Sequence, residues 1–492
     1  MVTPHSYRTE HTETQTTNQN YGEYFAIKSS KKIKIQPDLR KVLQYVDSNH
    51  LSFLDDLQEA IEIKSISGDI KYRDDLIKMV KFIEGWMVKM GAKYECFYVG
   101  YHNLGGKKVR LPPIILGTVK APGTKKKTIC VYGNIDIKNP NVVNWRTDPW
   151  KVDHNNKTIY GCGVAQGKGP LISWFHTIMA IKHQELQLPV NIKFIIESMY
   201  HQNSEGMKDF LMTQKQEFLS DIDYVVVCDS EWLGDKYPCV SYGCVGFIHY
   251  DVTVTKVEGS KSEPKDDLVR IFEKIAKGDK VLIPDLDKHV IQITPDEEQM
   301  FEKIHFHVED VRHLLPPDWQ NWDKIKLLMH YWRMPTIFVD DIEQCICEKK
   351  DFSKMKRKFV LKIVPRQTYD NCHEQVVDYI KSVAKDLDIT NTVEVDLISS
   401  SRPWLEDCAT VNYEAARRAT IQIYKEDPSM IREDRDSTSI NILEMIGKSI
   451  LLLPLVQKGG NGPDNECILA RNFYEGTKLI GAYLFQLAML TK

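Results

Sequence analysis

The stretch TICVYGNID at residues 128–136 begins as an apolar strand and ends on polar side chains. Three further apolar runs end in a similar way, at residues 192–197, 224–228 and 450–454. Runs of this length, separated by helical patterns, are typical of strands buried on both faces of a mainly parallel sheet. Because the carboxyl ends of parallel strands meet at one edge of a sheet, a functional site is expected at that edge.

Helical periodicity fills much of the chain between these strands. Apolar residues recur at helical spacing in several segments, as expected of helices with one buried face. Pro170 lies near the start of one of them, where a helix tolerates proline. The sequence therefore predicts an α/β domain with a mixed, mainly parallel sheet flanked by helices. The predicted helices cover residues 37–63, 75–90, 168–179, 206–218, 409–424 and 475–490.

A different order of elements occupies residues 246–399. The order strand–helix–strand–strand–helix–strand is that of small ferredoxin-like α+β domains. We therefore predict an inserted domain at residues 246–399, within an α/β domain formed by residues 36–245 and 400–492. The strands expected in the insertion lie at residues 247–254, 336–339 and 358–364, and the helices at residues 267–276, 297–314 and 374–386.

Composition excludes several classes of protein. A chain of 492 residues is too long for one hydrophobic core, which favours two domains. The formal net charge of −3 gives no overall field that would attract nucleic acid or a membrane surface. No apolar stretch is long enough for a membrane span, and no secretory signal is evident at the N-terminus. We expect a cytoplasmic protein that contacts neither nucleic acid nor membrane.

The first 35 residues differ from the rest of the chain. They are rich in Thr, Asn, Gln and Glu, a composition that cannot bury enough apolar surface to offset the entropy of ordering. This pattern predicts a disordered tail over residues 1–35. An arm that folds on a protein partner is the alternative.

Short motifs recur in a fixed order along most of the chain. They include WRTDPW at residues 145–150, KGP at 168–170, PCVSYG at 238–243, YWRMP at 331–335, RPW at 402–404 and YEGTK at 474–478. In this order they resemble the cytosolic non-specific dipeptidase and carnosinase family of dinuclear zinc metallopeptidases, from about residue 37 to the C-terminus. The resemblance implies a catalytic α/β domain, an inserted lid that forms homodimers, and hydrolysis of dipeptides by a water bound between two zinc or manganese ions.

The resemblance also implies which residues stand at the metal-binding positions. The first metal-binding histidine is replaced by Asn134, whereas the aspartate that orients it is kept as Asp136. The bridging aspartate is replaced by Gln166, a neutral amide that cannot bridge two cations as an anion. The pair formed by the general base and a ligand glutamate becomes Tyr200 and His201. Tyrosine has an unperturbed pKa near ~10 and is a poor base at neutral pH.

Two ligand positions remain. The next ligand is unchanged as Asp229, which could instead be an ordinary polar residue at a strand end. The last histidine falls in a loop where Gly462 is the best match. One ligand is therefore unchanged, and His201 could still bind a metal. Since two divalent ions carry four positive charges and one carboxylate remains, tight binding of zinc or manganese is not expected.

Changes also affect the positions that would hold the substrate. A glycine-flanked histidine of the family's lid has no counterpart in residues 258–265. A Gly-Gly-Ser loop that holds the substrate carboxylate is replaced by EDRD at residues 433–436. Arg333 lies within the YWRMP motif, and it could bind an anionic group or be a structural arginine at a strand start.

Three hypotheses follow from these substitutions. In the first, the chain is a pseudoenzyme that keeps the dipeptidase fold and the dimer and acts as a scaffold or binding protein. The second is a residual or altered metal-dependent hydrolase that uses His201, Asp229, Asp136 and Asn134. In the third, the protein binds a peptide or amino acid without cleaving it. A heteromeric partner that supplies missing groups through the lid is a further alternative.

Overall fold

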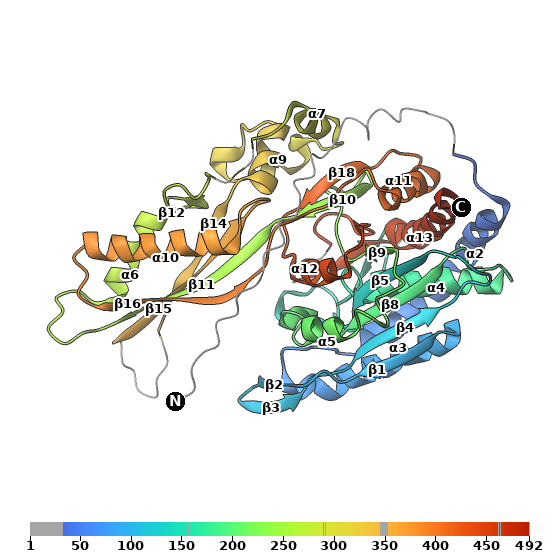
Figure 1. Ribbon diagram of the computed structural model, residues 1–492, viewed down its shortest axis with the longest axis horizontal. Helices are drawn as coiled ribbons and strands as arrows, with labels where there is room; N and C mark the ends of the chain where they lie inside the picture. Colours follow the sequence, from blue (N-terminus) through green and yellow to red (C-terminus); the bar gives the residue numbers. More distant parts are fainter. Residues whose placement is uncertain are drawn as a thin grey trace.

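The computed structural model describes residues 33–344 and 353–491, apart from residues 156, 289, 291, 461 and 463. These residues form two main β-sheets with their own helices, and the smaller sheet extends away from the larger one (Figure 1). The predicted tail lies almost entirely outside the described residues. No helix in the described part of the chain is long and apolar enough to cross a membrane.

The larger sheet, called the main sheet below, has nine strands with a parallel centre. Its central order is β8–β5–β9–β19, and neighbouring strands in this group are parallel. The predicted mixed, mainly parallel sheet is therefore confirmed, although four of its strands, β1, β10, β17 and β18, were not predicted. The central strands are β8 (Asn191–Glu197), β5 (Thr128–Asn134), β9 (Tyr224–Val227) and β19 (Ile450–Leu452), and the outer ones are β1 (Lys93–Phe97), β4 (Ile114–Val119), β10 (Cys239–Cys244), β17 (Trp404–Leu405) and β18 (Ser429–Glu433).

Alternation along β5 explains why the central strands are apolar on both faces. Ile129 and Val131 belong to one hydrophobic cluster, whereas Cys130 and Tyr132 belong to another on the opposite face. The first cluster contains the long helices, and the second contains two short ones. The long helices are α2 (Pro37–Glu62), α3 (Arg73–Met90), α4 (Lys168–His183), α11 (Val411–Tyr424) and α13 (Ala470–Leu490), and the short ones are α5 (Met207–Thr213) and α12 (Thr438–Leu443).

The smaller sheet, called the lid sheet below, has four antiparallel strands in the order β14–β15–β11–β16. Together with α6 and α10, which pack on it through a separate hydrophobic cluster, it has the predicted ferredoxin-like order of elements. The exact division of the chain into domains stays a prediction. The elements are β11 (Gly246–Thr255), α6 (Pro264–Ile275), β14 (Thr336–Gln344), β15 (Lys354–Ile363), α10 (Tyr369–Asp386) and β16 (Thr392–Ser400).

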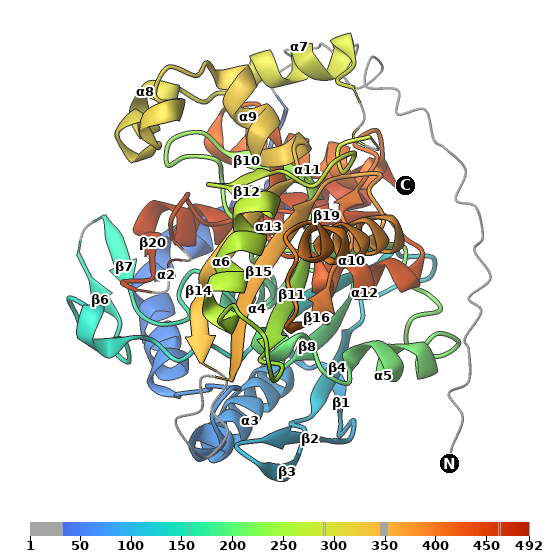
Figure 2. The ribbon, with the colours of Figure 1, turned by 90° about the vertical axis from the view of Figure 1, so that its left-hand side faces the viewer.

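Two predicted helices were wrong in extent. The segment at residues 297–314 is not one helix, because α7 (Pro295–Lys303) ends before α8 (Val308–Val311) begins. The helix expected at residues 206–218 ends at Thr213 as α5 and continues as turns. A further helix, α9 (Lys324–Arg333), was not predicted, and it lies beside α7 above the lid sheet (Figure 2).

Candidate functional site

The candidate site lies at the carboxyl ends of three neighbouring parallel strands, β5, β8 and β9. The residues that follow these strands are the ones that the sequence singled out: Asn134 and Asp136, then Tyr200 and His201, then Asp229. The parallel pairing brings these segments together although they are far apart in the chain. This placement is the usual one for a site in an open α/β sheet.

Asp136 organises the turn that carries Tyr200 and His201. Its carboxylate is fully buried and accepts hydrogen bonds from Ser67 Oγ at 2.7 Å, Tyr200 N at 3.1 Å and His201 N at 3.0 Å. Charge-assisted bonds to backbone N–H groups are among the stronger hydrogen bonds in proteins. Asp136 therefore fixes the backbone of residues 200 and 201, from which both side chains extend.

Asn134 and Gln166 present neutral amides at their positions. Asn134 is fully buried, and its Nδ2 donates to the backbone oxygen of Asp136 at 3.1 Å. Its Oδ1 is buried and has no hydrogen-bond partner. The side chain of Gln166 lines the cavity described below, whereas its backbone N–H is held from behind by Glu466 at 3.0 Å.

Glu466 was not recognised from the sequence, and it shapes the loop that carries Gln166. Its carboxylate accepts from the backbone N–H groups of Gly163 at 2.7 Å, Ala165 at 2.9 Å and Gln166 at 3.0 Å. Burial raises the pKa of Glu466 to about 7, against the opposing effect of these hydrogen bonds. The positive charge of Lys168 also opposes this rise in the pKa of Glu466, and its buried Nζ donates to backbone oxygens at the end of α2.

Tyr200 and His201 are both poorly suited to carry charge. Burial raises the pKa of Tyr200 further above its ordinary value, and nearby Asp229 adds to this effect. Burial lowers the pKa of His201 although Asp136 opposes the shift, so the imidazole is neutral at pH 7. The two rings meet edge to face at a centroid distance of 5.0 Å. A neutral imidazole is a usable metal ligand, but a protonated tyrosine is no base at this pH.

Asp229 is paired with an arginine that the sequence did not place beside it. Arg435 Nη1 lies 3.3 Å from Asp229 Oδ1, and Arg435 Nε lies 2.8 Å from Glu433 Oε2. The side chains of Asp229 and Glu433 are 5 % and 8 % exposed, and that of Arg435 is 20 % exposed. Burial disfavours the charge of Arg435, but Glu433 and Asp229 outweigh it and raise the pKa of the guanidinium.

Glu197 is a second buried acid that the sequence did not single out. It ends β8 and accepts hydrogen bonds from Tyr132 Oη and from Ser204 Oγ, the latter at 2.8 Å. Burial raises the pKa of Glu197 to about 8, so this carboxyl group is mostly protonated at pH 7. Glu197 directly follows an apolar run at residues 194–196, and nothing in the local sequence distinguishes it from an ordinary polar residue at a strand end.

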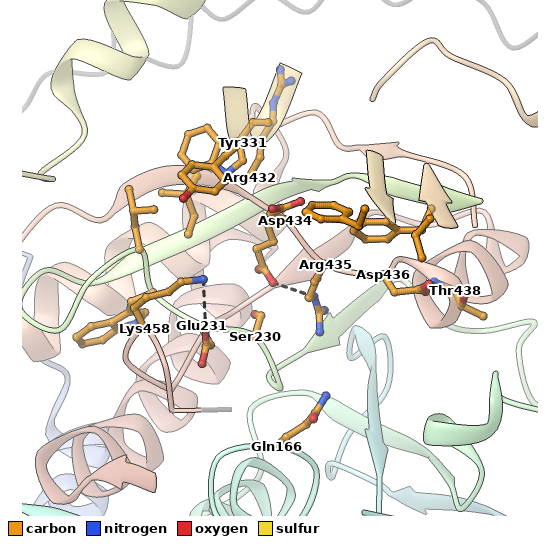
Figure 3. A pocket seen from close by; sticks show the side chains of 18 of the residues that line it. Gln166, Ser230, Glu231, Tyr331, Arg432, Asp434, Arg435, Asp436, Thr438 and Lys458 are labelled. Atoms are coloured by element: carbon orange, nitrogen blue, oxygen red, sulfur yellow. Dashed lines mark hydrogen bonds and ion pairs between the residues drawn. The ribbon is translucent and has the colours of Figure 1, made fainter. Parts of the chain in front are cut away.

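A cavity of about 930 Å³ opens above these residues, between the main sheet and the base of the lid sheet. Its lining includes Gln166, Tyr200 and His201, which follow the strands of the main sheet. Arg435, from the segment after β18, lies above Gln166 (Figure 3). Much of the remaining lining is apolar or aromatic. It includes Trp232, Phe247, Phe306, Tyr331, Trp332 and Phe338.

Five predicted site residues do not line this cavity. Asn134, Asp136 and Asp229 are buried at the strand ends, and Arg333 and Gly462 lie elsewhere. Arg333 is the last residue of α9 rather than a residue at a strand start, and its Nη1 lies 2.6 Å from Glu297 Oε2. Arg432 is ion-paired with the same carboxylate. Gly462 lies in the loop after β19, and neither Gly462 nor Arg333 lines the cavity.

Among the residues that the structure describes, no group of three or more His, Cys, Asp or Glu side chains is arranged to hold a metal ion. His201 and Asp229 are the candidate positions with groups that commonly bind zinc or manganese. The described cysteines are free thiols, and most of them are buried.

Comparisons with known proteins agree with the motifs. The model of peptidase family M20/M25/M40 matches residues 130–486. The Cys-Gly metallodipeptidase dug1 of Schizosaccharomyces pombe is 29 % identical over 92 % of this chain and 99 % of that protein. The beta-Ala-His dipeptidase of Homo sapiens is 29 % identical over 92 % of this chain and 93 % of that protein.

Solved structures give the same result. Human carnosine dipeptidase 1 has a TM-score of 0.84 and 27 % identity, and the match covers 93 % of this chain and 100 % of that one. The dipeptidase Dug1p of Saccharomyces cerevisiae has a TM-score of 0.84 and 26 % identity, over 92 % of this chain and 98 % of that one. The resemblance to dipeptidases and carnosinases is confirmed, and the chain belongs to peptidase family M20/M25/M40.

Proposed function

We propose that this protein keeps the fold of an M20 dipeptidase but does not hydrolyse dipeptides, and that it acts as a binding protein or scaffold. The observation that carries the proposal is the pairing of Asp229 with Arg435. Asp229 is the one carboxylate among the five inferred ligand positions, and a guanidinium lies 3.3 Å from it. A divalent ion at this carboxylate would face a fixed positive charge.

The donor set does not fit a dinuclear centre. Two divalent ions need several anionic ligands, including one that bridges them, and Gln166 is neutral at the inferred bridging position. Asn134 offers a neutral amide oxygen, Oδ1, in place of an imidazole, and such an oxygen is a poor ligand for zinc. Gly462 has no side chain to offer. With His201 and Asp229 left, most of the binding free energy of such a centre is absent.

The inferred position of the general base supports the same proposal. A base in this reaction must accept a proton from a metal-bound water near neutral pH. Tyr200 stands there, and burial raises its pKa further from this range. Asp136 and Glu197 do not replace it, because Asp136 holds the backbone of residues 200 and 201 and Glu197 is mostly protonated.

The cavity is retained and gives binding a physical basis. Its volume of about 930 Å³ lies within the range of small-molecule sites, and its lining combines aromatic faces with polar groups. A peptide or amino acid bound without cleavage is the ligand that fits the fold of the family. We further propose a cytoplasmic location, a homodimer formed through the lid sheet, and protein binding by the N-terminal tail.

A residual metal-dependent hydrolase is the second candidate. It is favoured by the neutral imidazole of His201, which lines the cavity, and by the metallodipeptidase relatives. Such an enzyme would use His201 and Asp229, with Asp136 and Asn134, to hold one zinc or manganese ion.

Metal content and ligand binding separate the two candidates. We expect purified protein dialysed against zinc or manganese to retain far less than one ion per chain by mass spectrometry. A dipeptide pool is expected to raise the melting temperature without release of amino acids, since a ligand that binds the folded state stabilises it. Stoichiometric metal that is lost in Asp229→Ala would contradict the proposal and support the hydrolase.

A further inference from the structure

The candidate site contains a cluster of two buried carboxylates and one guanidinium. Asp229 and Glu433 bring two carboxylates, and Arg435 brings a guanidinium between them. Buried carboxylates are stable only when a cation or several hydrogen bonds compensate their charge. In a metallopeptidase, metal ions supply that compensation at the carboxyl ends of the strands.

We propose that Arg435 is a built-in counter-ion, which takes the place of metal ions at Asp229 and excludes divalent cations from the site. The inference rests on the proposed function, because it assumes that no metal is held there. The EDRD segment at residues 433–436 then has a role, because its arginine places a permanent positive charge at the site. Arginine suits this role because its guanidinium does not lose its proton in proteins.

The loop that carries Arg435 is anchored on both sides, so its side chain has a defined direction. Asp434 forms an ion pair with the buried Lys362 at 3.6 Å. Asp436 Oδ1 accepts from Thr438 N at 2.6 Å, at the start of α12. The loop therefore turns Asp434 and Asp436 toward other partners and leaves Arg435 to extend toward the strand ends (Figure 3).

Unpaired oxygens around the guanidinium support the assignment. Asp229 Oδ2 and Glu433 Oε1 are buried and have no hydrogen-bond partner. The guanidinium of Arg435 is the main group that favours the charged form of Glu433, and the hydroxyls of Ser241 and Ser230 add to its effect. If the side chain of Arg435 were removed, two partly desolvated carboxylates would remain in a space that a cation had filled. That arrangement is a weak site for a hard divalent ion, since carboxylate oxygens suit such ions.

The experiment compares Arg435→Ala with three other variants. Arg435→Lys keeps a positive charge, and Arg435→Ala/Asp229→Asn removes one of the carboxylates that the arginine neutralises. Arg402→Ala is the matched surface control, because Arg402 pairs with Glu444 at 2.9 Å with a side chain that is 65 % exposed. Melting temperature is followed by calorimetry, and bound Mn²⁺ is counted by electron paramagnetic resonance.

We expect Arg435→Ala to melt several degrees below wild type, and the added Asp229→Asn to recover much of that loss. We also expect Arg435→Ala to bind Mn²⁺ at least about tenfold more tightly than wild type, a difference of about 1.4 kcal/mol. Arg435→Lys and Arg402→Ala are expected to remain close to wild type in both measurements. The inference is overturned if Arg435→Ala has the same melting temperature as Arg402→Ala. It is also overturned if Arg435→Ala binds no more Mn²⁺ than wild type.

The wild-type sample separates this failure from failure of the proposed function. Stoichiometric Mn²⁺ on wild-type protein, lost in the Asp229→Ala variant of the earlier test, would contradict the proposed function itself. If wild-type protein holds no metal, and Arg435→Ala matches it in melting temperature and in bound Mn²⁺, only the counter-ion role is contradicted. If Arg435→Ala does not fold, folding of the double variant would support the role, and failure of Arg435→Lys to fold would overturn it.

Discussion

Replacement of Glu297 with alanine is expected to lower the free energy of unfolding by about 3–5 kcal/mol, as for other broken buried ion pairs. Glu297 lies on α7 and accepts from Arg333 Nη1 at 2.7 and 2.6 Å, and it is also paired with Arg432 on β18. All three side chains are almost fully buried. The substitution removes the carboxylate that two buried guanidinium groups share.

Equilibrium unfolding in urea would measure this effect. Glu297→Gln keeps the size of the side chain without its charge and is expected to fall between alanine and wild type. Glu343→Ala is the surface control, since Glu343 pairs with Lys358 at 3.1 Å and is 51 % exposed. Its effect is expected to stay below about 1 kcal/mol. Equal effects of Glu297→Ala and Glu343→Ala would show that the buried cluster does not stabilise the fold.

Replacement of Glu466 with alanine is the second change with a large expected effect. It should lower the free energy of unfolding by about 3–5 kcal/mol. The carboxylate accepts from three backbone N–H groups of the loop that carries Gln166. Each buried donor that loses its acceptor costs about 1–3 kcal/mol, and water that enters the space recovers part of this. The variant should also expose the loop at residues 163–166.

Hydrogen exchange at Gly163, Ala165 and Gln166 would show where the effect of Glu466→Ala lies. We expect faster exchange at these amides in the variant, with little change in the lid sheet. Glu466→Gln retains one acceptor oxygen and should protect the loop partly. Unchanged exchange in this loop, together with wild-type stability, would contradict the role assigned to Glu466.

The main sheet was predictable because its centre is buried on both faces. Residues such as Ile129 and Tyr132 point to opposite hydrophobic clusters, and this produces the continuous apolar runs that the sequence displays. Short edge strands such as β17 and β18 gave weaker signals, because pairing with distant segments decides whether they form. The helix expected at residues 297–314 failed for a similar reason, since its apolar residues serve two separate packing contacts.

The candidate site was predictable only in part. Residues that directly follow parallel strands, such as Asp136 and Asp229, are brought together by the sheet itself. Arg435 meets Asp229 across 206 positions of the chain, through a loop whose path no local pattern fixes. Glu466 and Gly163 are separated by 303 positions and meet for the same reason. Contacts of this kind depend on tertiary structure and are absent from local sequence signals.

Release of free amino acids from a mixed dipeptide pool tests the central claim most directly. The assay uses wild-type protein at high concentration with added zinc or manganese, beside a metal-dependent member of the family and a protein-free blank. We expect no release above the blank from folded protein. Metal-dependent release that is abolished by a chelator and by Asp229→Ala would contradict the claim, and would show that the site hydrolyses peptides with fewer ligands.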